Sequence, residues 1–235
     1  MMQETRIAVV NGREVPVLIS DEKEALLAAK AAGRAIIGLW RPEQEMDEIS
    51  AARYVVEDPK DATEEYLERV ARRHLGLPWK ICETERLVIR EMFADDFDEV
   101  WSNQIGHGFG TIEELEAYTK NQYAFYEFGF WAVTEKESGE LVGMAGLTVP
   151  GEPDEDRYLW MELETGVENG EILELGYHIF PKFRRKGIAR EACEAVILYG
   201  VNELNVSKVI VRIEKDNEKS KNLAYGLGFQ MGVST

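Results

Sequence analysis

The stretch Ile172-Leu-Glu-Leu-Gly-Tyr-His-Ile179, Phe180-Pro-Lys-Phe183, Arg184-Arg-Lys-Gly-Ile-Ala189 predicts a strand, a loop and the first turn of a helix. A helix N-terminus has backbone N–H groups without acceptors inside the helix, and its dipole favours an anion. Gly187 removes the side chain where a phosphate would approach the backbone, and Ala189 keeps the next turn small. We therefore expect an anion site at the start of a long helix over 186–203.

The distribution of charge singles out the same stretch. The chain has 235 residues and a formal net charge of −17, of which residues 81–235 carry −14. Even so, a cluster of basic residues lies between positions 182 and 190: Lys182, Arg184, Arg185, Lys186 and Arg190. A basic cluster on an acidic domain indicates a local anion site, while the acidic remainder would attract a cationic amine. The overall negative charge argues against a nucleic acid partner.

Composition excludes several other classes of protein. No apolar run approaches the ~18 residues of a membrane span, and the N-terminus lacks the layout of a signal peptide. We therefore expect a cytoplasmic protein without a membrane partner. Cys82 and Cys193 are the two cysteines, too few for a disulfide framework or a four-thiolate zinc site, so no metal is expected.

The chain reads as two blocks, a small accessory α/β domain over 1–80 and a larger domain over 81–235. In the first, strands flank the turn Asn11-Gly12 and two helices follow, but no motif assigns a chemistry. In the second, strands and helices mix in an α/β (α+β) order. Its expected strands are 86–90, 130–134, 141–147, 157–164, 172–179 and 208–213, and its expected helices are 94–102, 111–126, 186–203 and 217–227.

The second block resembles the GNAT superfamily of acyl-CoA-dependent N-acetyltransferases. The family's pyrophosphate-binding signature, Arg/Gln-x-x-Gly-x-Gly/Ala after a strand, stands here as Arg184, Gly187 and Ala189. Further similar segments follow in order: Thr84–Glu91, the 130–147 hairpin, Leu175-Gly176-Tyr177, and Asn217-x-x-Ser220 before Leu227-Gly228-Phe229. Together they cover about 84–229 and look most like the branch that includes ribosomal-protein N-terminal acetyltransferases.

The resemblance implies a mostly antiparallel sheet flanked by helices, whose fourth and fifth strands splay apart around the pantetheine of acetyl-CoA. Backbone groups of Tyr177, His178 and Ile179 would bind the pantetheine and thioester. Asn217 and Ser220 would contact the cosubstrate from the last helix. The implied pyrophosphate-binding residues are Arg184, Arg185, Lys186, Gly187, Ile188, Ala189 and Arg190.

The implied reaction is transfer of the acetyl group to a primary amine by direct attack in a ternary complex. The amine could belong to a peptide N-terminus, a lysine, a polyamine or a small molecule, and a base must first deprotonate it. The family's tyrosine acid falls on Ala224 and a glutamate base used by some relatives falls on Arg212. We therefore expect Glu174 as the base, with Tyr225 or Tyr177 as the acid.

These two departures leave an alternative open: a catalytically weak CoA-binding module with a regulatory or scaffolding role. A third departure is the C-terminal end, because the family usually adds two strands after Gly-Phe and only residues 230–235 remain. An open sheet edge is prone to pairing with other chains. We therefore expect residues 1–80 or a second protomer, in a homodimer, to cover that edge.

Overall fold

The computed structural model describes all residues except 44, 104–108, 153–156 and 233–235. It divides into two compact units, Met1–Trp79 and Lys80–Thr235, one residue from the boundary that the sequence predicts. Each unit has buried clusters of its own.

The first unit is a four-stranded sheet in the order β1-β2-β3-β4, with one antiparallel hairpin, β1–β2, and two parallel pairs. Asn11 and Gly12 both have positive φ values, 51° and 78°, as the tight hairpin turn requires. The fourth strand, β4, is only two residues long. The elements are β1 Gln3–Val10, β2 Arg13–Ser20, α1 Lys23–Ala31, β3 Ala35–Leu39, η1 Met46–Ile49, β4 Val55–Val56, η2 Pro59–Asp61 and α2 Glu64–His74.

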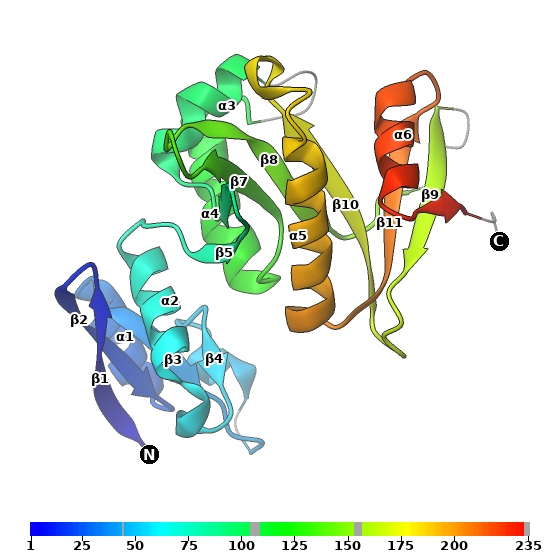
Figure 1. The fold of residues 1–235 in the computed structure, drawn as a ribbon. Helices are drawn as coiled ribbons and strands as arrows, with labels where there is room; N and C mark the ends of the chain where they lie inside the picture. Colours follow the sequence, from blue (N-terminus) through cyan, green and yellow to red (C-terminus); the bar gives the residue numbers. More distant parts are fainter. Residues whose placement is uncertain (44, 104–108, 153–156, 233–235) are drawn as a thin grey trace. The chain divides into compact units, whose positions relative to one another are not determined.

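The second unit is an eight-stranded sheet in the order β12-β9-β11-β10-β8-β7-β6-β5 (Figure 1). Only β10 and β11 run parallel, which confirms the mostly antiparallel sheet. The strands are β5 Lys80–Glu83, β6 Leu87–Arg90, β7 Phe130–Glu135, β8 Leu141–Thr148, β9 Tyr158–Glu164, β10 Glu171–Ile179, β11 Val206–Glu214 and β12 Gln230–Met231.

Helices cover both faces of this sheet. Tyr177 of β10 faces Cys193 of α5 and Ser220 of α6, whereas the next side chain, His178, bonds to α3. Because successive side chains of a strand point to opposite faces, α3 lies on the face opposite α5 and α6. The helical elements are η3 Ala94–Asp96, α3 Phe97–Asn103, α4 Ile112–Phe125, η4 Pro181–Phe183, α5 Ile188–Glu203 and α6 Glu218–Gly226.

The core of the second unit lies largely between the sheet and α5. Ala192, Cys193 and Val196 of α5 are fully buried, and burial raises the pKa of the Cys193 thiol to about 12. Cys193 therefore packs as an apolar residue, as its helical spacing predicts. Among the described residues, no helix is long and apolar enough to cross a bilayer. No group of three His, Cys, Asp or Glu side chains in the same ranges is placed to hold a metal ion.

The strand beyond β11 is β9, which precedes β10 in the sequence. Residues 158–164 of β9 pair antiparallel with residues 208–214 of β11, and β12 adds two residues to the outer side of β9. A strand of the same unit therefore covers β11, which the sequence does not predict. A homodimer at the outer edge of the sheet stays a prediction.

The role of β9 as a core strand predicts unequal effects of two methionine substitutions. Met161 of β9 is fully buried, whereas Met231, paired with it from β12, is 51% exposed. We expect Met161→Ala to lower the free energy of unfolding by about 2–5 kcal/mol, and Met231→Ala to change it by less than about 0.5 kcal/mol. Urea unfolding curves measure both, and equal effects would show that β9 does not belong to the core.

Candidate functional site

The candidate site begins where two strands part. Parallel pairing of β10 with β11 ends at the pair Glu174–Ile210. Beyond it, residues 175–179 pair only with β8, and residues 211–214 pair only with β9 (Figure 1). The backbone groups of β10 that would face β11 are therefore left without a ladder partner, and such groups need another partner when they leave water. This is the splay that the sequence predicts.

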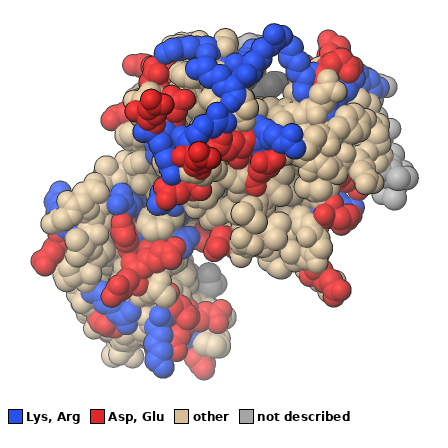
Figure 2. All heavy atoms as spheres, in the orientation of Figure 1, with Lys and Arg blue, Asp and Glu red and all other residues tan. Residues whose placement is uncertain are grey.

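The loop between β10 and α5 has an unusual backbone. Arg185 and Gly187 both have positive φ values, 63° and 79°, and the left-handed region costs a non-glycine residue about 1–2 kcal/mol. Gly187 is the N-cap of α5 and offers no side chain to cap the helix. The N–H groups of the first turn therefore remain available to an anion. In Figure 2, basic side chains gather over the segment that precedes α5.

Three of the five clustered cations already have partners. Arg184 donates from Nε to the Ile179 carbonyl at 2.8 Å, and Lys182 pairs with Glu140 at 2.8 Å. Arg190 donates from Nε to Glu194 at 2.9 Å and from Nη2 to the Gly226 carbonyl at 2.6 Å. Arg184 and Arg190 therefore brace the loop and α5.

Two cations remain for a ligand. In the described part of the chain, neither Arg185 nor Lys186 forms an ion pair, and both are exposed. The Lys186 ammonium lies 5.3 Å from the centre of the Phe183 ring. These two side chains, rather than the whole cluster, are the cations that a phosphate group could recruit.

The start of α6 lies beside β10. The Asn217 side chain caps this helix, because its Oδ1 accepts from the Ser220 backbone N–H at 3.1 Å. Burial raises the pKa of the Tyr177 phenol, and the Ser220 hydroxyl acts in the opposite direction. The structure thus brings Tyr177, Asn217 and Ser220 together, as the sequence predicts, with Asn217 organising the helix start.

The two neighbouring positions near the end of α6 face opposite ways. Ala224, where the family commonly has its tyrosine acid, is 4% exposed and faces inward, whereas Tyr225 is 53% exposed. Ala224 follows Ser220 by four residues and therefore lies on the same face of α6. That is the face toward Tyr177. Ala224 and Tyr177 belong to the same hydrophobic cluster.

Glu174 forms an ion pair at the point where the strands part. Its Oε1 accepts from Arg212 Nε at 2.8 Å, and its Oε2 accepts from the Gly151 backbone N–H at 3.3 Å. Arg212 also donates to the Glu152 carbonyl at 3.3 Å. Both carboxylate oxygens accept a hydrogen bond, so Glu174 holds the Arg212 side chain and the Gly151 backbone in place. Sequence reasoning missed this pair because it joins two strands that are distant in the sequence.

His178 faces away from α5 and α6. Its Nε2 lies 2.9 Å from the Asn103 carbonyl of α3, so Nε2 carries a hydrogen and donates it. Burial lowers the pKa of the imidazole, while the bond to Asn103 acts against that shift. Phe180 donates its backbone N–H to the Val142 carbonyl of β8, and His178 lies two residues earlier, opposite Met144 of the same strand. Because this orientation repeats every second residue of an antiparallel ladder, the backbone groups of His178 face β8 and not the parted strands.

Comparison with known proteins agrees with this geometry. A model of the acetyltransferase (GNAT) domain matches residues 78–230. The uncharacterised N-acetyltransferase YoaA of Bacillus subtilis (strain 168) is 25% identical over 162 residues, 64% of this chain and 82% of that protein. The uncharacterised N-acetyltransferase YjdG of the same organism is 31% identical over 102 residues, 43% of this chain and 51% of that protein.

Among solved structures, one assigned to the GNAT family, from Bordetella pertussis, superposes with a TM-score of 0.50 at 22% identity. It covers 65% of this chain and 89% of that chain. At this identity the likeness supports the fold.

The lowered pKa of His178 predicts how stability responds to acid. The unfolded state takes up a proton near the ordinary pKa of 6.5, and the folded state does so only at lower pH. Between those values the unfolded state binds more protons, so stability falls as the pH drops through 6.5. His178→Gln keeps a donor for the Asn103 carbonyl and does not titrate. Thermal unfolding at about pH 7.5 and 5.5 should show a larger loss for the wild type than for the variant; equal losses would contradict this assignment.

Proposed function

The chain belongs to the GNAT acetyltransferase family, as the match over residues 78–230 shows, and we propose that it transfers the acetyl group of acetyl-CoA to a primary amine by direct attack in a ternary complex. The observation that carries the proposal is the parting of β10 and β11 beside the uncapped N-terminus of α5. Acetyl transfer from acetyl-CoA is the family's chemistry. The amine acceptor is the proposed part.

The residues present fit acetyl-CoA. Gly187 presents no Cβ, and the heavy atom nearest to the position that a Cβ would take is Arg86 Nη2, at 3.4 Å. A pyrophosphate can therefore approach the N–H groups at the start of α5, with Arg185 and Lys186 supplying charge. The backbone groups of Tyr177 and the backbone N–H of Ile179 face away from β8 and would hold the extended pantetheine. One of these N–H groups would stabilise the negative charge that develops on the thioester oxygen.

We propose Tyr177 as the acid that protonates the departing thiolate. Burial keeps its phenol protonated at neutral pH, as an acid must be. It also faces the side of α6 on which Ala224 replaces the family's tyrosine. Tyr225, the other candidate, is 53% exposed.

Glu174, which the sequence analysis expects to be the base, forms contacts that favour a different role. As a base, Glu174 would have to take a proton while it also holds Arg212 and the Gly151 N–H. We propose that Glu174 instead orients Arg212 and, through the Gly151 backbone, the segment that leads from β8 toward β9. The net charge of −14 over 81–235 would favour a cationic acceptor: a peptide N-terminus, lysine, polyamine or small amine.

One set of observations favours a second function, a catalytically weak CoA-binding module. Ala224 occupies the family's acid position, Arg212 occupies its base position, and Glu174 is engaged by Arg212. None of these contacts involves the loop before α5, so such a protein would still bind CoA. Turnover with any amine separates the two functions.

The proposed cosubstrate site predicts that a side chain with a negative charge at position 187 abolishes stabilisation by acetyl-CoA. Acetyl-CoA at about a hundred times its dissociation constant should stabilise the wild type by about 2.7 kcal/mol, or about 5–10 °C. In Gly187→Asp this shift should disappear, because the carboxylate repels the pyrophosphate and the side chain fills its approach. Thermal unfolding with and without acetyl-CoA measures both.

Gly139→Asp is the matched control. Gly139 also has a positive φ, 71°, and open space around it, but it lies in the β7–β8 turn. The Gly139→Asp variant adds the same charge and similar backbone strain, and acetyl-CoA should raise its unfolding temperature as much as that of the wild type. If the wild type shows no shift, or Gly187→Asp keeps it, CoA does not bind at α5.

The proposed acid predicts a difference between two tyrosines. Tyr177→Phe should lower kcat by about 10²-fold and leave CoA affinity nearly unchanged, because only the hydroxyl is removed. Tyr225→Phe should leave both unchanged. Release of free thiol from acetyl-CoA with a panel of amines (a peptide, lysine, spermidine and an arylamine) measures kcat. Equal kcat values for the wild type and Tyr177→Phe would exclude Tyr177 as the acid.

A further inference from the structure

A partly buried carboxylate joins the turn before β6 to the first turn of α5. Glu191 accepts hydrogen bonds from the Thr84 hydroxyl, from the Arg86 backbone N–H at 3.1 Å and from Arg86 Nε at 2.7 Å. Its side chain is 20% exposed. Burial acts to raise the pKa of Glu191, but the hydrogen bonds from Thr84 and Arg86 outweigh it and the pKa is lowered. Glu191 is therefore ionised at neutral pH.

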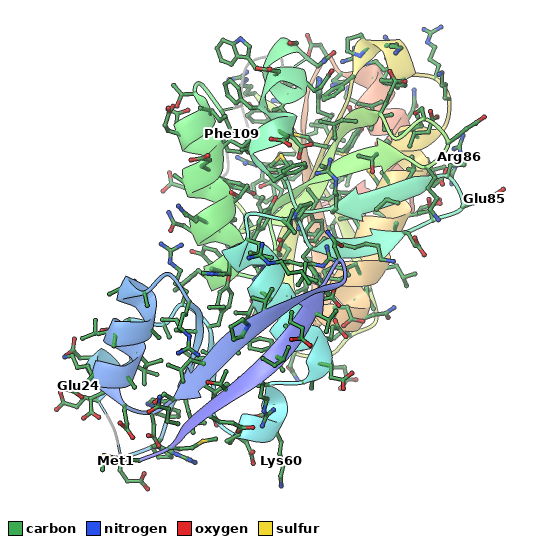
Figure 3. All side chains as sticks on the ribbon, turned by 90° about the vertical axis from the view of Figure 1, so that its left-hand side faces the viewer. Met1, Glu24, Lys60, Glu85, Arg86 and Phe109 are labelled. Atoms are coloured by element: carbon green, nitrogen blue, oxygen red, sulfur yellow. The ribbon has the colours of Figure 1, made fainter. Side chains whose placement is uncertain are left out.

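Arg86 extends from this carboxylate to the anion-binding loop. Its Nη1 donates to the Lys186 carbonyl at 2.9 Å, while Nε and Nη2 hold Glu191. Figure 3 shows Arg86 and Glu85 in the turn that leads into β6. All three guanidinium nitrogens thus have protein partners. Arg86 therefore connects the Lys186 carbonyl of the loop to Glu191 of α5 and is not a free cation.

The contact with the Lys186 carbonyl fixes the next N–H. In a planar trans peptide the C=O and the N–H point in opposite directions. Holding the Lys186 carbonyl toward Arg86 therefore turns the Gly187 N–H away from Arg86. The left-handed backbone at Arg185 is unfavourable by itself, so this loop conformation needs contacts of this kind to persist.

We propose that Arg86, held by Glu191, is a positioning residue that sets the pyrophosphate-binding conformation of residues 184–187. This inference rests on the proposed binding of acetyl-CoA at α5. It assigns a function to two residues outside the family signature, and it predicts that removing an acidic side chain near the phosphates weakens CoA binding. Simple electrostatics predicts the opposite, because loss of a negative charge should favour an anion.

The experiment measures CoA dissociation constants by titration calorimetry for the wild type, Arg86→Gln, Arg86→Lys, Glu191→Gln and the double variant Arg86→Gln/Glu191→Gln. Each single variant should bind CoA about tenfold more weakly, the scale of one charge-assisted hydrogen bond. The double variant should be no weaker than the weaker single variant, because the two residues act as a unit. Arg86→Lys should not restore affinity, since an ammonium cannot hold the carboxylate and the carbonyl together.

Arg72→Gln is the control, because Arg72 pairs with Glu68 at 2.7 Å in the first unit and should leave CoA affinity unchanged. Unfolding curves without ligand establish that every variant is folded at the titration temperature. Wild-type affinity in Arg86→Gln overturns the inference, and so does equal or tighter binding in Glu191→Gln. Full rescue by Arg86→Lys would assign Arg86 to direct attraction of the phosphates instead. Absence of CoA binding by the wild type would overturn the proposed function itself.

Discussion

Backbone pairing between β10 and β11 stops after Glu174–Ile210, and the rest of the site depends on that break. Leaving strand backbone unpaired inside a protein is costly, so two central strands can part only if each keeps a partner on its other side. β10 stays paired with β8 as far as Ile179, and β11 stays paired with β9 as far as Glu214. The unpaired inner edges then form a place where an extended polar chain can complete the hydrogen bonding.

This requirement explains the position of β9. The strand after α6, β12, pairs with the outer side of β9 and not with β11. β9 supplies the cover from earlier in the sequence, with Met161 opposite Val211 on the buried face and Glu162 bonded to Lys208 on the other. The outer neighbour of β11 is thus a strand that precedes it in the chain, whereas the family usually adds strands after Gly-Phe.

The sequence predicted what local patterns determine. The strand, loop and helix around Gly187, the turn at Asn11-Gly12 and the apolar stripe of α5 follow from short-range geometry, and all are present. The partner of β9 was not predictable, because its alternation of apolar residues shows a strand but not its neighbour. The ion pairs Glu174–Arg212 and Arg86–Glu191 were not predicted for the same reason. Each joins residues that are distant in the sequence and meet only in the folded unit.

The basic cluster shows why charge alone overstates a ligand site. Arg184 ties the loop to the end of β10 through the Ile179 carbonyl, and Arg190 ties the first turn of α5 to the end of α6 through the Gly226 carbonyl. α6 follows β11 in the chain, so the loop is fastened to both sides of the parted strands. A ligand that binds the N–H groups of this loop therefore interacts with a structure connected to each strand, and movement of either strand would change the geometry that the ligand meets. Two of the five clustered cations thus hold the loop in place, and a third pairs with Glu140, which leaves the loop backbone, Arg185 and Lys186 for a ligand.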